Sequence, residues 1–286
     1  MKILSYLIRF TSKIIHDIIT GRKKDFMITI KSKDEIELMR HAGKLVSLTH
    51  QYLKPYIKPG ITTKELDKLA YDFIKKHDAT PSCLGYEGFP ATLCTSINDE
   101  VVHGIPSNRK LKNGDIITID MVIGYKGYQG DAAWTYAVGD ISEKKKYLME
   151  HTEKALYEGI KMVKPGNRIG DISNAVENYA KKHKLGVVKE LCGHGIGIDM
   201  HEDPDIPNYG KAGTGPRLKE GMVICIEPML NLGTADIYML DDDWTIKTDD
   251  GAPAAHYEHT ILITKDGYEI LTPRLDHDDI YNNLGK

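Results

Sequence analysis

Apolar side chains recur at helical spacing in four segments of the chain. They predict helices over residues 33–52, 63–77, 142–163 and 169–184, with Ser32 as an N-cap and Thr62 at the start of the second helix. Shorter apolar runs predict strands from about residue 92, on both sides of a turn at 124–130 within residues 111–138, and over 187–197, 221–230 and 256–271. Helices thus precede strands twice, which predicts an α+β fold with two related halves around a central cleft.

Residues 1–26 have a pattern of their own. Isoleucine and leucine side chains follow one helical face, polar side chains fill the other, and a basic stretch comes after Gly21. A cleaved signal peptide does not fit, because Arg9 interrupts the apolar run and no A-x-A site follows. Three interpretations remain. The helix packs on the body of the protein, it anchors the protein to a surface or partner, or Met27 is the true start and this extension is not translated.

Composition narrows the class of protein. The 286 residues are 41% hydrophobic, which supports a sizeable core, and the net charge of −3 predicts no general attraction to nucleic acid or anionic membranes. The four cysteines show no CxxC spacing, so they read as reduced thiols of a cytoplasmic protein. No apolar stretch is long enough to span a bilayer.

Carboxylates stand among runs that otherwise read as buried strands. Asp120 ends the run 116–119, Glu227 separates 222–226 from 229–230, and Glu258 precedes 260–263. An ionised carboxylate in such a place costs several kcal/mol unless it is paired. No lysine or arginine lies inside those runs. Divalent metal would neutralise several acids at once, and a site sharing four of them has room for two ions.

A fourth acid and an imidazole complete this set. Asp131 follows Asp120 by eleven residues across the glycine-rich turn, so a hairpin would bring the two carboxylates together, although a polar strand end and a turn aspartate would look the same. His194 lies among glycines that allow close backbone approach, and His201 follows seven residues later. Imidazole with several carboxylates suits Zn, Mn, Fe or Co.

These motifs resemble those of the type I methionine aminopeptidases, from about Met27 to Thr272. The matching stretches are co-linear: residues 96–106 (SINDEVVHGIP), 119–120 (ID), 130–131 (GD), 192–197 (CGHGIG), 226–229 (IEPM) and 257–260 (YEHT). The resemblance implies a pita-bread fold, in which two pseudo-symmetric α/β halves surround a cleft for two divalent metal ions per subunit, drawn from Co, Zn, Mn, Fe or Ni. It also implies that residues 27–286 form the catalytic domain.

The resemblance assigns roles by position. Asp120 would bind one metal, Asp131 and Glu258 would bridge both, and His194 with Glu227 would complete the shell of the second. His103 and His201 would contact the substrate and its reacting amide. The pocket for the methionine side chain would be lined by Cys83, Tyr86, Phe89, Cys94, Met200 and Trp244, and contacts of sulfur with aromatic rings are favourable there.

The activity implied is removal of the N-terminal methionine from nascent proteins and peptides, preferentially when the second residue is small and uncharged. Metal-activated water would attack the first peptide bond, with His201 stabilising the oxyanion, Glu227 passing a proton to the leaving amine and His103 positioning the amide nitrogen. The partners implied are the N-termini of nascent chains, with ribosome association through residues 1–26 as a further hypothesis, no nucleic-acid readout, and a monomer.

Two positions depart from the usual pattern of that family. Met200 stands where phenylalanine is frequent, which could change the shape of the pocket. His256 stands where glutamine is common, and a titratable ring there could alter the surroundings of the metal ligands and the pH profile of the activity. Three alternatives share the fold. An X-Pro peptidase usually carries a large extra N-terminal domain, which 26 residues cannot supply. A type II enzyme carries an insertion for which the step from His201 to Glu227 leaves no room. A non-catalytic binding module would have lost metal ligands, and all five are present.

Overall fold

The computed structural model describes residues 27–275, and the four predicted helices are present. They are α2 (Lys33–Leu53), α3 (Thr63–Lys76), α4 (Glu143–Ile160) and α5 (Ile169–Lys182), with short 3-10 turns η1 (Lys54–Tyr56) and η2 (Tyr86–Gly88). Ser32 and Thr62 cap α2 and α3 as predicted, each in a capping box with the glutamate three residues on. The amphipathic stretch 1–26 lies outside the described residues. None of the described helices is long and apolar enough to cross a membrane.

The first half of the chain builds a sheet on the predicted hairpin. β4 (Ile116–Tyr125) pairs along its length with β5 (Tyr128–Ala137), and its other edge pairs with β1 (Thr80–Pro81) and β2 (Cys94–Ile97). The turn is tighter than the 124–130 region predicted, because both strands continue through Gly124 and Gly130 and leave only Lys126 and Gly127 between them.

The second half builds a five-stranded sheet in the order β15-β14-β9-β7-β8. Its strands are β7 (Cys192–Gly195), β8 (Glu202–Pro207), β9 (Val223–Ile226), β14 (His259–Ile263) and β15 (Tyr268–Ile270). The structure also has two three-stranded sheets. One holds β13 (Ala254–His256), β10 (Met229–Asn231) and β6 (Gly186–Val187), and the other holds β11 (Ile237–Met239), β12 (Ile246–Thr248) and β3 (Glu100–Val102). The sequence pattern did not predict β1, β3, β8, β11 or β12, all short or lacking clean alternation.

A line of hydrogen bonds joins the two halves between β5 and the β13–β14 segment. The amide of Glu258 donates to the carbonyl oxygen of Ala133 at 2.7 Å. The hydroxyl of Thr260 accepts from the amide of Asp131 at 3.0 Å and donates to its carbonyl oxygen at 2.8 Å. The backbones that carry Asp131 and Glu258 are therefore fixed against each other, although the residues are far apart in sequence.

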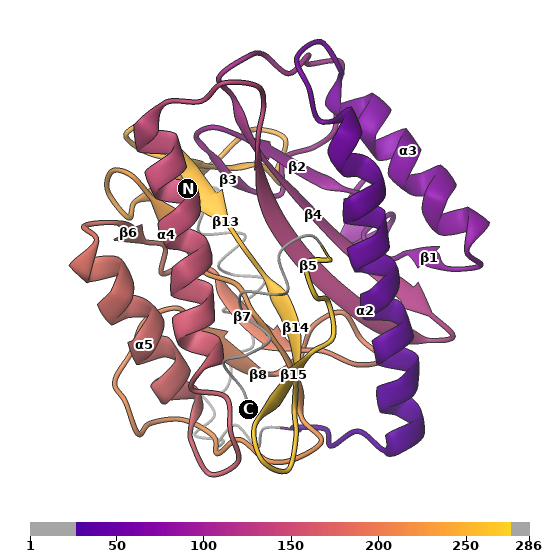
Figure 1. Ribbon diagram of the computed structural model, residues 1–286, viewed down its shortest axis with the longest axis vertical. Helices are drawn as coiled ribbons and strands as arrows, with labels where there is room; N and C mark the ends of the chain where they lie inside the picture. The colour runs from indigo at the N-terminus through magenta and orange to yellow at the C-terminus, as the bar shows by residue number, and fades with distance from the viewer. Residues whose placement is uncertain (1–26, 276–286) are drawn as a thin grey trace.

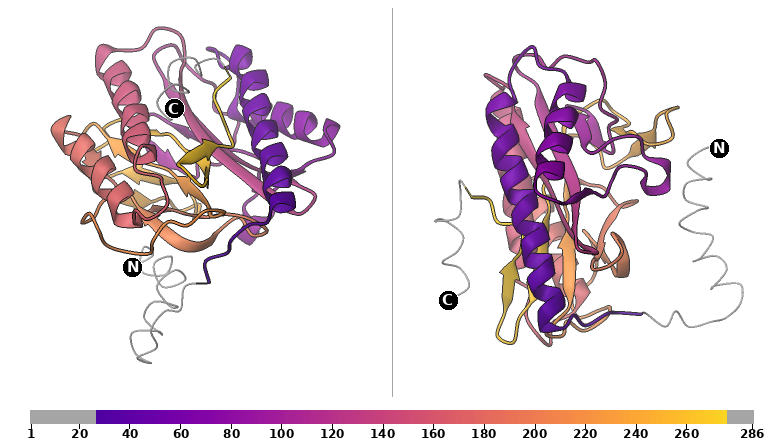
Figure 2. Two further views of the ribbon diagram at one scale, coloured as in Figure 1. Left: turned by 60° about the horizontal axis from the view of Figure 1, so that its bottom comes forward. Right: turned by 90° about the vertical axis from the view of Figure 1, so that its right-hand side faces the viewer.

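The helices cover one face of the strands. Figure 1 shows α4 and α5 over one half and α2 and α3 over the other, and the side view in Figure 2 places α2 and α4 on one side of the strands. Gly130 faces α2 so closely that an added Cβ would lie 2.6 Å from the amide nitrogen of Gly43. Successive side chains of a strand point to opposite faces, so Asp131 points away from the helices.

Candidate metal centre and active site

Strand alternation turns the predicted acids toward one face. Ile119 and Met121 of β4 lie in the main core, so Asp120 and Val122 face the other way. Asp131 lies directly across the ladder from Val122 and so shares that face with Asp120.

On β9, Ile224 and Ile226 belong to the core that packs under α4 and α5, which leaves Glu227 at the strand end. The hairpin interpretation of Asp120 and Asp131 is consistent with this register.

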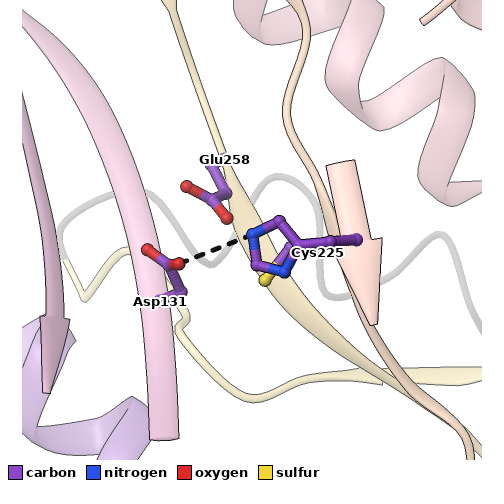
Figure 3. A group of neighbouring side chains, drawn as sticks. Asp131, Cys225 and Glu258 are labelled. Carbon is purple, nitrogen blue, oxygen red and sulfur yellow. Dashed lines mark ion pairs between the residues drawn. The ribbon is translucent and has the colours of Figure 1, made fainter. Parts of the chain in front are cut away.

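One buried group of potential metal ligands lies within the described residues. Ligand atoms of Asp131, His194, Cys225 and Glu258 all lie within 4.8 Å of one another. Figure 3 shows Asp131, Glu258 and Cys225 converging, with a dashed line from Asp131 to an imidazole; Nε2 of His194 lies 3.8 Å from Oδ2 of Asp131. Glu227 adjoins the group, because its Oε1 lies 3.5 Å from the same nitrogen.

The glycines around His194 bring its strand close to both neighbours. A Cβ at Gly193 would lie 2.3 Å from the carbonyl oxygen of Cys225, and one at Gly195 would lie 2.2 Å from that of Asp203. The Nδ1–H of His194 donates to the carbonyl oxygen of Gly195 at 2.9 Å, which leaves the lone pair of Nε2 directed at the acids. The prediction that glycine permits close backbone approach here is confirmed.

Burial and mutual repulsion govern the electrostatics of the acids. Burial raises the pKa of Asp120 to about 7. Burial, reinforced by neighbouring carboxylates, raises the pKa of Asp131, Glu227 and Glu258 well above their usual values. Burial also lowers the pKa of His194 to about 3, so its ring is neutral at pH 7 and adds no positive charge.

The site therefore has the properties of a divalent-metal centre. Two buried carboxylate oxygens, Oδ1 of Asp131 and Oε1 of Glu258, have no hydrogen-bond partner. The ion-pair partners of Asp131 and Glu227 are histidine rings, which are neutral here. Several carboxylates and one neutral imidazole form a donor set that suits divalent transition metals, and a cation would remove the repulsion among the acids.

The residues predicted to recognise substrate also come together. Cys83, Phe89, Cys94 and Met200 are buried in one cluster, with Tyr86 and Trp244 packed against it. This cluster adjoins the acids, because Cys94 lies opposite Asp120 in the ladder.

The two other predicted histidines lie beside the pocket and the acids. The ring of His103 meets the edge of Trp244, with 6.4 Å between ring centroids, and its backbone has a φ of 58° that non-glycine residues rarely adopt. The residue His201 is exposed overall, but its ring is held in the site, with its Nδ1 2.8 Å from the hydroxyl of Tyr86 and its centroid 4.3 Å from that of His194. Burial lowers the pKa of this ring to about 4.

The residue at position 256 lies beside the acids as well. Nε2 of His256 is 3.7 Å from Oε2 of Glu227, and neither ring nitrogen has a hydrogen-bond partner. Burial, with a contribution from His103, lowers the pKa of His256 to about 3, so the ring is neutral at pH 7. His256 thus adjoins the acids, at the position where the sequence departs from the usual pattern of the family.

Sequence reasoning missed several members of the site. Cys225 lies in the ligand group, and Ala91, Ile105 and Val122 line the pocket cluster. A signal for Cys225 existed, because it stands two residues before Glu227 and so shares its face of β9. The small and aliphatic pocket residues gave none, since nothing distinguishes them from core residues.

Comparisons with known proteins agree with this geometry. The model of metallopeptidase family M24 matches residues 37–265. The chain belongs to metallopeptidase family M24. Within M24, it is 53% identical over 246 residues to methionine aminopeptidase 1 of Bacillus subtilis, an alignment that covers 86% of this chain and 99% of that protein. It is 52% identical to a methionine aminopeptidase of Clostridium acetobutylicum, over 86% of this chain and 99% of that one.

Solved structures of M24 members separate the alternatives. Methionine aminopeptidase from Rickettsia prowazekii superposes with a TM-score of 0.85 at 46% identity, covering 86% of this chain and all of that one. A prolidase from Pyrococcus horikoshii superposes with a TM-score of 0.71 at 25% identity, and only 64% of it is covered. The pita-bread fold and the resemblance to type I methionine aminopeptidases are therefore confirmed, and this chain spans much less of the prolidase.

Proposed function

We propose that this protein removes the N-terminal methionine from newly made chains, preferentially when the second residue is small and uncharged. The observation that carries the proposal is the position of the buried, unpaired carboxylates beside a pocket lined by sulfur and aromatic rings. An unbranched thioether side chain fits such a pocket, because sulfur makes favourable contacts with aromatic rings. The relatives named methionine aminopeptidase support the same activity.

Five residues would hold two divalent cations. Asp131 and Glu258, which converge from the two halves, would contribute ligands to both ions. Asp120 would complete the shell of one ion, and His194 with Glu227 that of the other. When bound, the two ions would act as Lewis acids and lower the pKa of water shared between them. Co, Zn, Mn, Fe and Ni all suit these donors, and supply in the cell decides among them.

The remaining side chains would bind and orient the substrate. The pocket would hold the methionine side chain, and His103 would hold the scissile amide nitrogen. His201, at the exposed edge of the site, would donate a hydrogen bond to the oxyanion that develops on the carbonyl oxygen. Glu227, whose pKa is raised by burial and by Asp131, is suited to take a proton and return it to the leaving amine.

Release of free methionine tests this proposal. Metal-stripped protein would be given Met-Gly-Met-Met and a Met-Pro peptide, with Co, Mn, Fe or Zn restored in turn. We expect metal-dependent release that is lost in Glu227→Ala, whereas Glu37→Gln, an exposed change on α2, keeps full activity. If the folded, metal-loaded protein releases no methionine with any metal, the proposed activity is wrong.

We further propose a cytoplasmic monomer that acts near the ribosome. All four cysteines are free thiols, which suits a reducing compartment. Residues 27–286 would form the catalytic domain, and residues 1–26 an extension that docks it on ribosomes. Deleting residues 1–26 would then reduce co-sedimentation with ribosomes without changing cleavage of a short peptide. Unchanged sedimentation would contradict the docking role.

A further inference from the structure

The first described residues lie against the loop that carries His201. We call residues 27–31 the strap and residues 197–203 the His201 loop. The amide of Met27 donates to Oδ2 of Asp203 at 3.2 Å, at one end of the strap. At the other end, the amide of Lys31 donates to the carbonyl oxygen of Gly221 at 2.8 Å. The strap therefore spans from the His201 loop to the segment that leads into β9.

A buried ion pair fastens the strap to the loop. Nζ of Lys31 lies 2.5 Å from Oε2 of Glu202, and the two side chains are only 5% and 11% exposed. The hydroxyl of Thr29 donates to the same carboxylate oxygen at 2.6 Å. The other oxygen of Glu202 accepts from the amide of Asp199 at 3.4 Å. A buried charge without its partner is strongly unfavourable, so this pair strongly favours one loop position.

The loop backbone closes around the ammonium group. A Cβ at Gly197 would lie 2.3 Å from Nζ of Lys31 and 2.4 Å from Oε1 of Glu202, so a larger residue there would have to displace the ion pair. From the opposite side, the amide of Gln129 donates to the carbonyl oxygen of Gly197 at 2.9 Å, and its side-chain amide donates to that of Ile198 at 3.2 Å. The loop is thus held between the strap and the β4–β5 hairpin.

The residues carried by this loop face the substrate pocket. Met200 is buried in the pocket cluster, and His201, next to Glu202, contacts Tyr86. The hydroxyl of Tyr86 and the ring of His194 orient the His201 ring, and the backbone of the loop sets where that ring lies relative to both. The position of His201 therefore depends on the backbone around Glu202, which is held both by its pairing with Gly195 of β7 and by the ion pair with Lys31.

We propose that Lys31 is a positioning residue that acts through Glu202 to set Met200 and His201 against an N-terminal methionine. The inference rests on the proposed function, because it assumes that Met200 and His201 meet the substrate. Lys31 itself does not touch the acid cluster. Its loss would therefore leave metal binding intact while it misplaces the two contacts on the loop, and a displacement of about 1 Å at such contacts costs roughly 100-fold in rate.

Steady-state kinetics with matched variants test this role. Lys31→Met would leave Glu202 buried and unpaired, so the double variant Lys31→Met/Glu202→Gln, which has no unpaired charge, is measured beside it. Lys31→Arg is the conservative variant, and Lys33→Met, at the exposed start of α2, is the control. Each is assayed on Met-Gly-Met-Met and on the matching Leu peptide, with metal content and amide hydrogen exchange of residues 197–203 followed in parallel.

We expect both Lys31→Met variants to bind two metals, to exchange the loop amides faster, and to lose about 10- to 100-fold in kcat/KM for the methionine peptide. The preference for the methionine peptide over the leucine peptide falls together with kcat/KM. A loss of folded protein would lower the rate on both peptides equally and would leave this preference unchanged. Lys31→Arg restores most of the rate, and Lys33→Met matches the unmodified protein. If the unmodified protein is active and the double variant keeps its rate and preference within about twofold, the positioning role is wrong. If the unmodified protein releases no methionine with any metal, the proposed function itself fails.

Discussion

Metal binding by the acid cluster should release protons near pH 7. In the metal-free protein, burial raises the pKa of Asp120 to about 7, and burial with neighbouring charges raises the pKa of Asp131, Glu227 and Glu258. Asp120 therefore carries part of a proton at pH 7 that metal ligation must displace, and the raised pKa values of the other acids act in the same direction. The ring of His194, with a pKa of about 3, is already neutral and contributes none.

The size of the effect follows from these values. An acid with a pKa of about 7 is half protonated at pH 7, so Asp120 alone releases about half a proton per chain, and the other three acids add to it. For each proton released on binding, the metal affinity rises by roughly tenfold, or about 1.4 kcal/mol, for every unit by which the pH is raised. The direction of this pH effect is fixed, because the carboxylates must ionise to bind the metal. Affinity should therefore rise from pH 6 to pH 8.

Calorimetric titration with Mn²⁺ measures this release directly. Metal-free protein is titrated at pH 7 in two buffers that differ in ionisation enthalpy, and the difference in apparent heat gives the number of protons released. Asp120→Asn should release fewer protons, and the exposed control Glu37→Gln should match the unmodified protein. Equal heats in both buffers, with tight binding, would refute the claim that the metal-free cluster holds protons.

Three further changes have defined outcomes. Cys225→Ala should weaken metal binding by about 10- to 100-fold without changing the stoichiometry, because the thiol lies within 4.8 Å of ligand atoms of Asp131, His194 and Glu258 and supports that group. A sulfur-to-cobalt charge-transfer band that this change abolishes would instead make the thiol a ligand. Ser32→Ala should cost about 1 kcal/mol in urea unfolding at pH 7. Hydrogen bonds from Ser32 and Tyr128 lower the pKa of Glu35 to about 2. The stabilisation that ionised Glu35 gives the folded protein is therefore fully present above pH 4.5 and is lost as the pH falls toward 2. Gly130→Ala should cost about 1–3 kcal/mol, since its Cβ would meet the backbone of α2, whereas Gly267→Ala meets nothing and should be neutral by thermal unfolding.

Periodicity predicted the helices well because each has both a regular apolar face and recognisable ends. Ser32 placed the start of α2 to the residue, and Thr62 with Thr63 placed that of α3 to within one, since a hydroxyl just before an apolar-periodic segment is a local signal. Short strands such as β8 and β12 escaped prediction. β8 pairs with the neighbouring β7, but its six residues include two prolines and lack a clean alternation of apolar and polar positions. β12 has only three residues, too few to show alternation, and it pairs with the distant β3.

The site was predictable where its chemistry conflicts with its surroundings. Glu227 and Glu258 were conspicuous because a carboxylate inside an apolar run needs a reason to be there. Cys225 was not conspicuous by itself, because a thiol in a buried strand is as ordinary as a valine; its one signal was its position two residues before Glu227. The ion pair between Lys31 and Glu202 was equally hidden, since the two residues lie 171 positions apart and only the folded chain brings them together.

The central claim is that the buried acids hold two metal ions where an N-terminal methionine is cleaved. Anomalous diffraction from crystals of the manganese-loaded protein with bound methionine tests it most directly. The account predicts two anomalous peaks about 3.5–4 Å apart. Asp131 and Glu258 would contact both, and the methionine side chain would lie in the pocket beside Cys94 and Met200. A single peak, peaks remote from these carboxylates, or methionine bound elsewhere would contradict it.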